Sequence, residues 1–180
     1  MSVVNLANKI TLARIMLVPV FVVVYSMNIY AAAAVFLLAS ATDKLDGYIA
    51  RKYNQITNLG KLLDPLADKL LIAAALILMV NAHLIGAWIA AIIIGREFVI
   101  TGIRIVASAQ GIALQADQFG KLKMVFQAVA IMAVLLDNYP FSFLTDLPVD
   151  QALMAAALAL TVYSGYNYVR NNYRRLHLDL

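Results

Sequence analysis

Four aspartates carry the clearest chemical signal in the sequence. Asp43 and Asp46 are three residues apart, and Asp64 and Asp68 are four residues apart. Such spacings put side chains on one face of a helix, so each pair shares a face of its own helix. If the two faces meet, the four carboxylates converge, and they need positive charge to stay ionised. The spacing therefore predicts a site for two hard divalent ions, Mg²⁺ or Mn²⁺, of the kind that assists phosphoryl displacement.

Ion pairing with nearby bases is the simpler alternative for these acids. The bases between residues 43 and 69 are Lys44, Arg51, Lys52, Lys61 and Lys69. Ion pairing, however, would not require two same-face pairs on successive helices, nor small residues between them. One acid that is less tied to metal could take a proton from an attacking hydroxyl. Zinc is disfavoured, because His83 and His177 lie far along the chain from the acids.

Small residues separate the two aspartate pairs. Gly47 lets a bulky ligand approach the backbone closely, and Ala50 follows one turn later on the same face. We expect Gly60 to end a connecting loop and Pro65 to lie in the first turn of the next helix. The N-terminus of that helix would favour anions such as phosphate.

The composition indicates lipid as the solvent of this chain. Of its 180 residues, 63% are hydrophobic and 13% are charged, whereas a soluble domain carries roughly a quarter charged residues. Six stretches approach the about 20 residues that a bilayer crossing needs: about 10–28, 30–51, 62–81, 84–106, 120–137 and 150–170. We therefore expect an all-α integral membrane protein with six transmembrane helices in a single domain, residues 1–180, preceded by a short interfacial segment at residues 1–9.

Lysine and arginine placement predicts the orientation. The connections at residues 28–30, 81–84 and 137–150 contain none of the 14 basic residues, all of which lie at or near the opposite side. That side is assigned to the cytoplasm, with both termini and the aspartates at the inner ends of helices two and three. The net charge of +4 then reflects topology and anionic headgroups, not nucleic-acid binding. The absence of cysteine excludes disulfides and thiolate metal sites.

The whole stretch reads Asp43-x2-Asp46-Gly47-x2-Ala50-Arg51-x8-Gly60-x3-Asp64-x3-Asp68. It resembles, at every defined position, the signature of the CDP-alcohol phosphatidyltransferases. The resemblance covers nearly the whole chain. Residues 8–14 are similar to the N-terminal segment of the family, and residues 60–69, 96–104 and 120–123 are similar to the subgroup whose acceptor is glycerol 3-phosphate.

The resemblance implies a reaction in which glycerol 3-phosphate attacks CDP-diacylglycerol, releasing CMP and forming phosphatidylglycerol phosphate. It also implies a homodimer in a bacterial cytoplasmic membrane, surrounded by lipid. Asp43, Asp46 and Asp64 would be metal ligands, and Asp68 the base that also touches metal. The surface for the cytidine diphosphate part would comprise Asp46, Gly47, Ala50, Arg51 and Gly60.

The acceptor phosphate needs cations of its own. Arg104 and Lys121 match family positions proposed for that phosphate, and Arg96 is a further candidate. Their alternative role is positive-inside topology alone. Glu97 would either order Arg96 or Arg104 or form a plain ion pair.

Two rival functions stay open. A sister transferase would share the mechanism but use inositol phosphate, serine or phosphatidylglycerol as acceptor. A cation transporter is disfavoured, because its acids would lie nearer mid-bilayer in repeated halves. We assign His83 no chemical role, Tyr168 to packing or an interfacial belt, and Ser164 and Gly165 to close helix approach.

Overall fold

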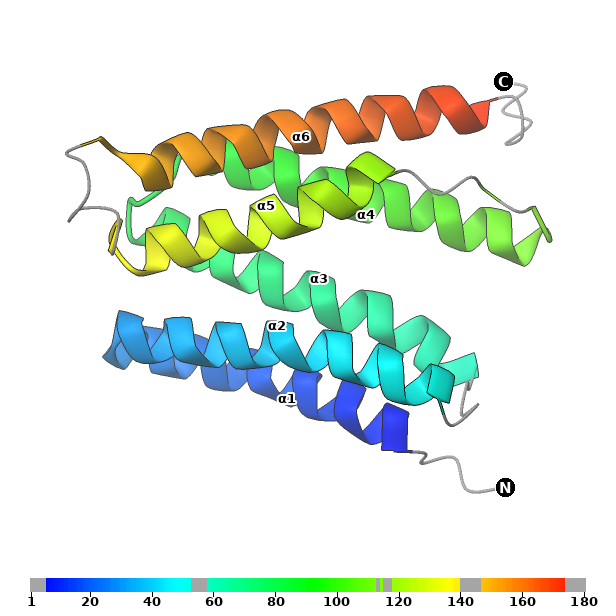
Figure 1. Cartoon of the computed structure of the whole chain (residues 1–180), viewed down its shortest axis with the longest axis horizontal. Helices are drawn as coiled ribbons and strands as arrows, with labels where there is room; N and C mark the ends of the chain where they lie inside the picture. The colour runs from blue at the N-terminus through cyan, green and yellow to red at the C-terminus, as the bar shows by residue number, and fades with distance from the viewer. Residues whose placement is uncertain (1–5, 53–57, 113, 115–117, 140–146, 174–180) are drawn as a thin grey trace. The chain divides into compact units, whose positions relative to one another are not determined.

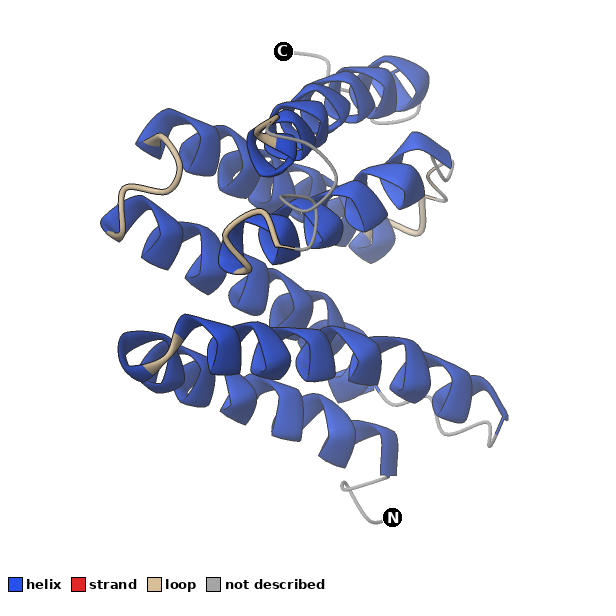
Figure 2. Ribbon diagram, turned by 60° about the vertical axis from the view of Figure 1, so that its left-hand side comes forward, coloured by secondary structure: helices blue, strands red, loops and turns tan. Residues whose placement is uncertain are grey.

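The computed structural model of the chain is built from helices. It describes residues 6–52, 58–112, 114, 118–139 and 147–173; within the helices, the side chains of residues 6–11, 43–52, 58–65, 68, 109 and 118 are not described. Figure 2 shows that every regular element in these described ranges is a helix, with no strand.

The six helices follow one another as expected (Figure 1). They are α1 (Leu6–Met27), α2 (Ile29–Lys52), α3 (Asn58–Asn81), α4 (Ala87–Ala109), α5 (Gln118–Leu135) and α6 (Val149–Asn172). The prediction of an all-α chain with six helices is confirmed. In the part of the chain that the structure describes, no helix is both long enough and apolar enough to cross a membrane. The six transmembrane spans therefore stay a prediction.

Two helices begin earlier than expected. α1 begins at Leu6, so residues 6–9 of the expected interfacial segment are helical, and residues 1–5 lie outside the described residues. α3 begins at Asn58, so Gly60 lies inside the helix instead of ending a loop, and Pro65 lies beyond its first turn. The expectations for Gly60 and Pro65 were wrong because a bilayer-length apolar window does not register the polar turns by which a helix extends, whereas the interfacial placement of residues 1–9 stays a prediction. Pro65 has no N–H for the carbonyl of residue 61, a hydrogen bond that an α-helix would otherwise make.

The chain divides into two compact units, and its prediction as a single domain stays untested. The first unit, Met1–Ile85 with Leu135–Asp137, is organised around α1, which packs against both α2 and α3. The rings of Phe21 and Phe36, both buried, lie 6.0 Å apart between α1 and α2. The Tyr25 hydroxyl donates a hydrogen bond to the Leu78 carbonyl oxygen at 3.4 Å, linking α1 to α3. Buried small residues let the helices approach closely: Ala32, Ala33, Ala39, Ala67 and Ala75.

A single residue, Asn28, joins α1 to α2. Its side-chain Oδ1 accepts hydrogen bonds from the backbone N–H groups of Tyr30 at 2.9 Å and Ala31 at 3.1 Å. It therefore satisfies donors that the first turn of α2 would leave free. So short a connection makes α1 and α2 antiparallel neighbours, as Figure 1 shows.

His83 ends α3. Its backbone is left-handed, with φ of 58°. The N–H of His83 bonds to the Val80 carbonyl at 3.0 Å, and the N–H of Leu84 bonds to the Met79 carbonyl at 2.9 Å. These two bonds form a Schellman motif with His83 at the position where glycine is usual. The structure thus gives His83 a backbone role.

The second unit, Gly86–Val134 with Asn138–Leu180, contains α4, α6 and most of α5. α4 and α6 pack together and run parallel, while α5 runs the opposite way (Figure 1). α5 joins α6 through the rings of Phe119 and Tyr163, which meet edge to face at 5.0 Å. The C-terminal ends of α4 and α6 therefore lie at the same end of this unit as the start of α5, and that end carries Arg104, Lys121 and Arg170.

We expect His83→Gly to raise the free energy of unfolding by roughly 0.5–1 kcal/mol, because relieving a left-handed side chain outweighs the extra entropy of glycine. Thermal unfolding of the purified protein measures the effect. His83→Val is the matched control and should lower stability, because a branched side chain resists this conformation. Loss of stability in His83→Gly would contradict the assigned role.

Candidate functional site

The four aspartates occupy matched levels on two antiparallel helices. The helical backbone of α2 and α3 runs through all four positions, so both spacings are helical as predicted. Asp46 lies six residues before the end of α2, and Asp64 lies six residues after the start of α3. Asp43 and Asp68 lie nine and ten residues from the same ends. At the rise of an α-helix, the two levels are about 9 Å and about 14 Å from the connection between α2 and α3.

The side chains at these positions lie outside the described residues, so the metal site stays a prediction. Among the side chains that are described, no group of three or more His, Cys, Asp or Glu residues could hold a metal ion. The predicted nucleotide-binding residues have described backbones only. Gly47, Ala50 and Arg51 follow Asp46 toward the end of α2, and Gly60 lies in the first turn of α3.

A buried ionic network joins α4 to α5 in the second unit. Glu97 Oε1 accepts hydrogen bonds from Arg96 Nη1 at 3.1 Å and from Lys123 Nζ. The side chains of Arg96, Glu97 and Lys123 are 15%, 12% and 2% exposed. The sequence left open whether Glu97 pairs with Arg96, and the structure shows that it does. Lys123 was not anticipated as its second partner.

Arg96 is also held by α6. Its Nη2 donates a hydrogen bond to Ser164 Oγ at 3.1 Å, and this hydroxyl donates to the Thr161 carbonyl at 3.2 Å. A β-carbon added at Gly165 would lie 3.2 Å from Arg96 Cγ, so the glycine makes room for the arginine. The expectation of close approach at Gly165 is confirmed. Arg96 Nε remains buried and without a hydrogen-bond partner.

Arg104 and Lys121 differ from Arg96 in exposure and in pairing. Both side chains are exposed, and neither has a hydrogen bond or an ion pair with any described residue. Arg104 lies near the end of α4 and Lys121 in the first turn of α5, at the same end of the second unit. Two exposed cations without a partner among the described residues are available to bind an anion. Their role at an acceptor phosphate stays a prediction.

The sequence assigned Tyr168 on α6 to packing or an interfacial belt, and the structure shows it buried, with 6% exposed. Its hydroxyl has no hydrogen-bond partner among the described residues. Arg104 and Arg96 are described cations whose charge acts on this hydroxyl. No sequence signal could have singled it out, because its neighbours come from α4.

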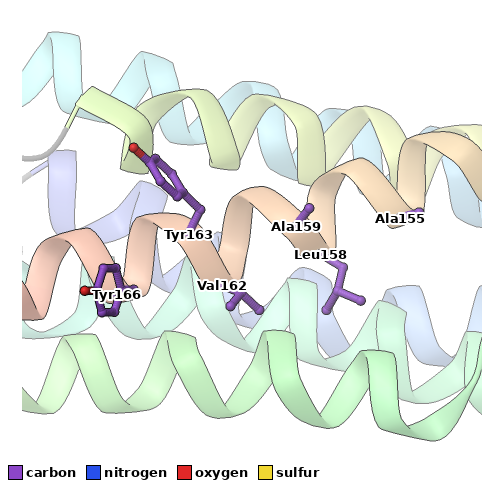
Figure 3. Close-up of a pocket in the computed structure, with 6 residues that line it drawn as sticks. All are labelled: Ala155, Leu158, Ala159, Val162, Tyr163 and Tyr166. Carbon is purple, nitrogen blue, oxygen red and sulfur yellow. The ribbon is translucent and has the colours of Figure 1, made fainter.

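A hollow on the surface of α6 is of a different character (Figure 3). It is lined by Ala155, Leu158, Ala159, Val162, Tyr163 and Tyr166, all from α6. Its surface is almost wholly apolar and offers no cation to a phosphate. None of the predicted site residues lines this hollow.

Comparison with known proteins gives a consistent result. The CDP-alcohol phosphatidyltransferase family matches residues 4–163. A CDP-diacylglycerol–glycerol-3-phosphate 3-phosphatidyltransferase of Bacillus subtilis is 43% identical over 96% of this chain and 97% of its own. Proteins of the same name from Pseudomonas fluorescens and Rickettsia typhi are 36% and 34% identical, over 97% and 92% of this chain and 93% and 96% of theirs.

We expect Glu97→Gln to lower the free energy of unfolding by about 3 kcal/mol, because the buried ammonium of Lys123 would then face a neutral amide. Denaturant unfolding of the purified protein measures the loss. Adding Lys123→Met should restore part of it, since the second change removes the buried charge. If Glu97→Gln is as stable as the parent protein, the network does not hold α4 to α5.

Proposed function

The chain belongs to the CDP-alcohol phosphatidyltransferase family, and from that premise we propose that it is the enzyme that transfers the phosphatidyl group of CDP-diacylglycerol to glycerol 3-phosphate. The products are phosphatidylglycerol phosphate and CMP. The observation that carries the proposal is the likeness, over 96% of the chain, to a relative with this activity in its name. The complete eight-position signature on α2 and α3 supports the same reaction.

The proposed step is a displacement at phosphorus. A hydroxyl oxygen of glycerol 3-phosphate forms a new bond to the phosphorus atom of the phosphatidyl group. The bond from that phosphorus to the bridging oxygen of the pyrophosphate breaks, and its electron pair leaves with CMP. The Asp68 carboxylate accepts the proton of the attacking hydroxyl.

We propose that two divalent ions are held by four carboxylates, those of Asp43, Asp46, Asp64 and Asp68. An all-carboxylate set suits Mg²⁺ or Mn²⁺, and the matched levels of the four positions on α2 and α3 fit a shared site. When bound, such ions offset the negative charge of the pyrophosphate and of the displacement.

The remaining residues bind the two substrates. Gly47, Ala50 and Gly60 lack bulk where the cytidine diphosphate part would approach α2 and α3, and Arg51 supplies a cation there. Arg104 and Lys121 would bind the non-reacting phosphate of the acceptor, since both are exposed and have no ion-pair partner among the described residues. Arg96 would contribute the Nε–H group, which has no partner among the described residues, to the same phosphate.

We also propose that the protein works as a homodimer embedded in a bacterial cytoplasmic membrane. The six apolar stretches of the sequence support this placement. So do large apolar side chains that are more than half exposed in both units, and that would be unfavourable against water: Met16, Leu38, Ile77, Trp88 and Val99. The basic end of the second unit would face the cytoplasm, together with both termini.

Incorporation of radiolabelled glycerol 3-phosphate into lipid tests the function. We expect label in lipid and release of CMP only when CDP-diacylglycerol and Mg²⁺ or Mn²⁺ are both present. A panel of acceptors should include inositol phosphate, serine and phosphatidylglycerol. Faster CMP release with one of these would overturn the acceptor but keep the class of enzyme. Metal-dependent ion uptake into vesicles without CMP release would instead indicate a transporter.

Asp68→Asn should reduce turnover to background, because the proton acceptor is lost, while metal binding is partly kept by the other three carboxylates. Asp43→Asn should weaken metal affinity as well. Activity and Mn²⁺ binding, measured on the same preparations, separate the two effects. Near-normal turnover in Asp68→Asn would contradict its role as the base.

The absence of cysteine allows a clean test of orientation. Leu84→Cys and Gln110→Cys place single thiols at exposed sites after α3 and after α4. In right-side-out vesicles, we expect a membrane-impermeant maleimide to label position 84 and spare position 110, and inverted vesicles should show the reverse. Labelling of both positions in both preparations would overturn the membrane-spanning arrangement.

A further inference from the structure

The hydroxyl of Tyr168 has no partner within the described residues. It is buried on α6, with 6% of the residue exposed. A buried hydroxyl left without a hydrogen bond is unfavourable, and buried tyrosine hydroxyls usually have a partner. Phenylalanine would fill the same space without that cost. The hydroxyl therefore indicates a partner that the described residues do not provide.

The surroundings of this hydroxyl specify the charge of that partner. Ser164, which contacts Arg96, lies one turn before Tyr168 on α6. Arg104 lies eight residues after Arg96 on α4, which is about 12 Å along the helix axis. Because α4 and α6 run parallel, Tyr168 lies at a level between the two arginines, and both act on its hydroxyl.

At this place, the polar atoms without a hydrogen-bond partner among the described residues can all donate. Arg96 Nε is buried without a partner, like the Tyr168 hydroxyl, and Arg104 has no ion pair with any described residue. A water molecule could accept a hydrogen bond here but would not offset two positive charges. An anion with several acceptor oxygens would do both, and a phosphate group matches these donors.

We propose that the Tyr168 hydroxyl donates a hydrogen bond to the non-reacting phosphate of the acceptor, beside Arg96 Nε and the Arg104 guanidinium. This inference rests on the proposed function, which supplies a phosphorylated acceptor. It makes α6, which carries none of the signature residues, part of the acceptor-binding site. Tyr168 is thus a substrate-binding residue that favours phosphorylated over unphosphorylated acceptors.

Tyr168→Phe in the full-length protein tests the inference. A hydrogen bond to a charged group is worth about 1.5–3 kcal/mol, so the apparent KM for glycerol 3-phosphate should rise about 10- to 100-fold. The KM for CDP-diacylglycerol should stay within about twofold. Tyr166→Phe is the matched control, because Tyr166 lies on the same helix but is exposed; its kinetics should be unchanged.

Thermal unfolding separates binding from a structural role. Without substrate, Tyr168→Phe should be as stable as the parent protein or more stable, because it removes an unpaired buried hydroxyl. Inorganic phosphate should stabilise the parent protein and Tyr166→Phe, but stabilise Tyr168→Phe less. Lower stability with an unchanged KM would overturn the inference in favour of a hydrogen bond within the protein or to a buried water.

A rise in the KM for CDP-diacylglycerol alone would also overturn the inference, because the hydroxyl would then bind the phosphate of the nucleotide lipid. The proposed function fails separately, if the parent protein releases no CMP with glycerol 3-phosphate. The stabilisation by inorganic phosphate needs no turnover, so equal stabilisation of the parent protein and Tyr168→Phe would sink the inference in either case.

Discussion

Helix α1 packs against both α2 and α3, and these two helices pack much less against each other. The relative height of the two aspartate pairs therefore depends on a helix that carries neither pair. Phe21 of α1 meets Phe36 of α2, and Tyr25 of α1 bonds to the backbone of α3 at Leu78. Since one turn of α-helix spans about 5.4 Å, a slip of one turn at either contact would remove the match between levels on which a shared ion site depends.

Four cations of the second unit form two pairs that differ in burial and in ion pairing. Arg96 is partly buried and Lys123 is buried, and they share the carboxylate of Glu97, which ties α4 to α5. Arg104 and Lys121 are exposed and have no ion pair with described residues. The first pair stabilises the arrangement of helices, and the second pair is the one that we propose binds the acceptor phosphate. Helix α4 contributes to both pairs, so the structural network and the proposed binding surface share one element.

The sequence predicted all six helices, because each must present a long apolar stretch, and the observed bounds depart from the expected ones by only a few residues. The expected start of α3 came too late in the sequence, so Gly60 was placed at the end of a loop and Pro65 in the first turn of the helix, since hydropathy does not register polar helical turns. The helical spacing of the aspartates could be predicted because helix periodicity depends only on residues that are close together in the sequence. The Glu97–Lys123 pair and the Ser164 contact with Arg96 could not be predicted, because the partners come from different helices. The Tyr168 hydroxyl could not be singled out either, because its lack of a partner among the described residues depends on burial by other helices.

Gly165 also determines where the Arg96 side chain can lie. The Cγ atom of that side chain lies 3.2 Å from the place that a β-carbon at position 165 would occupy. A methyl group there would therefore push Arg96 aside by a few tenths of an ångström or widen the space between α4 and α6. Either shift would move the guanidinium relative to the Tyr168 phenol, and the proposed affinity for phosphate would change although none of the proposed ligands is replaced.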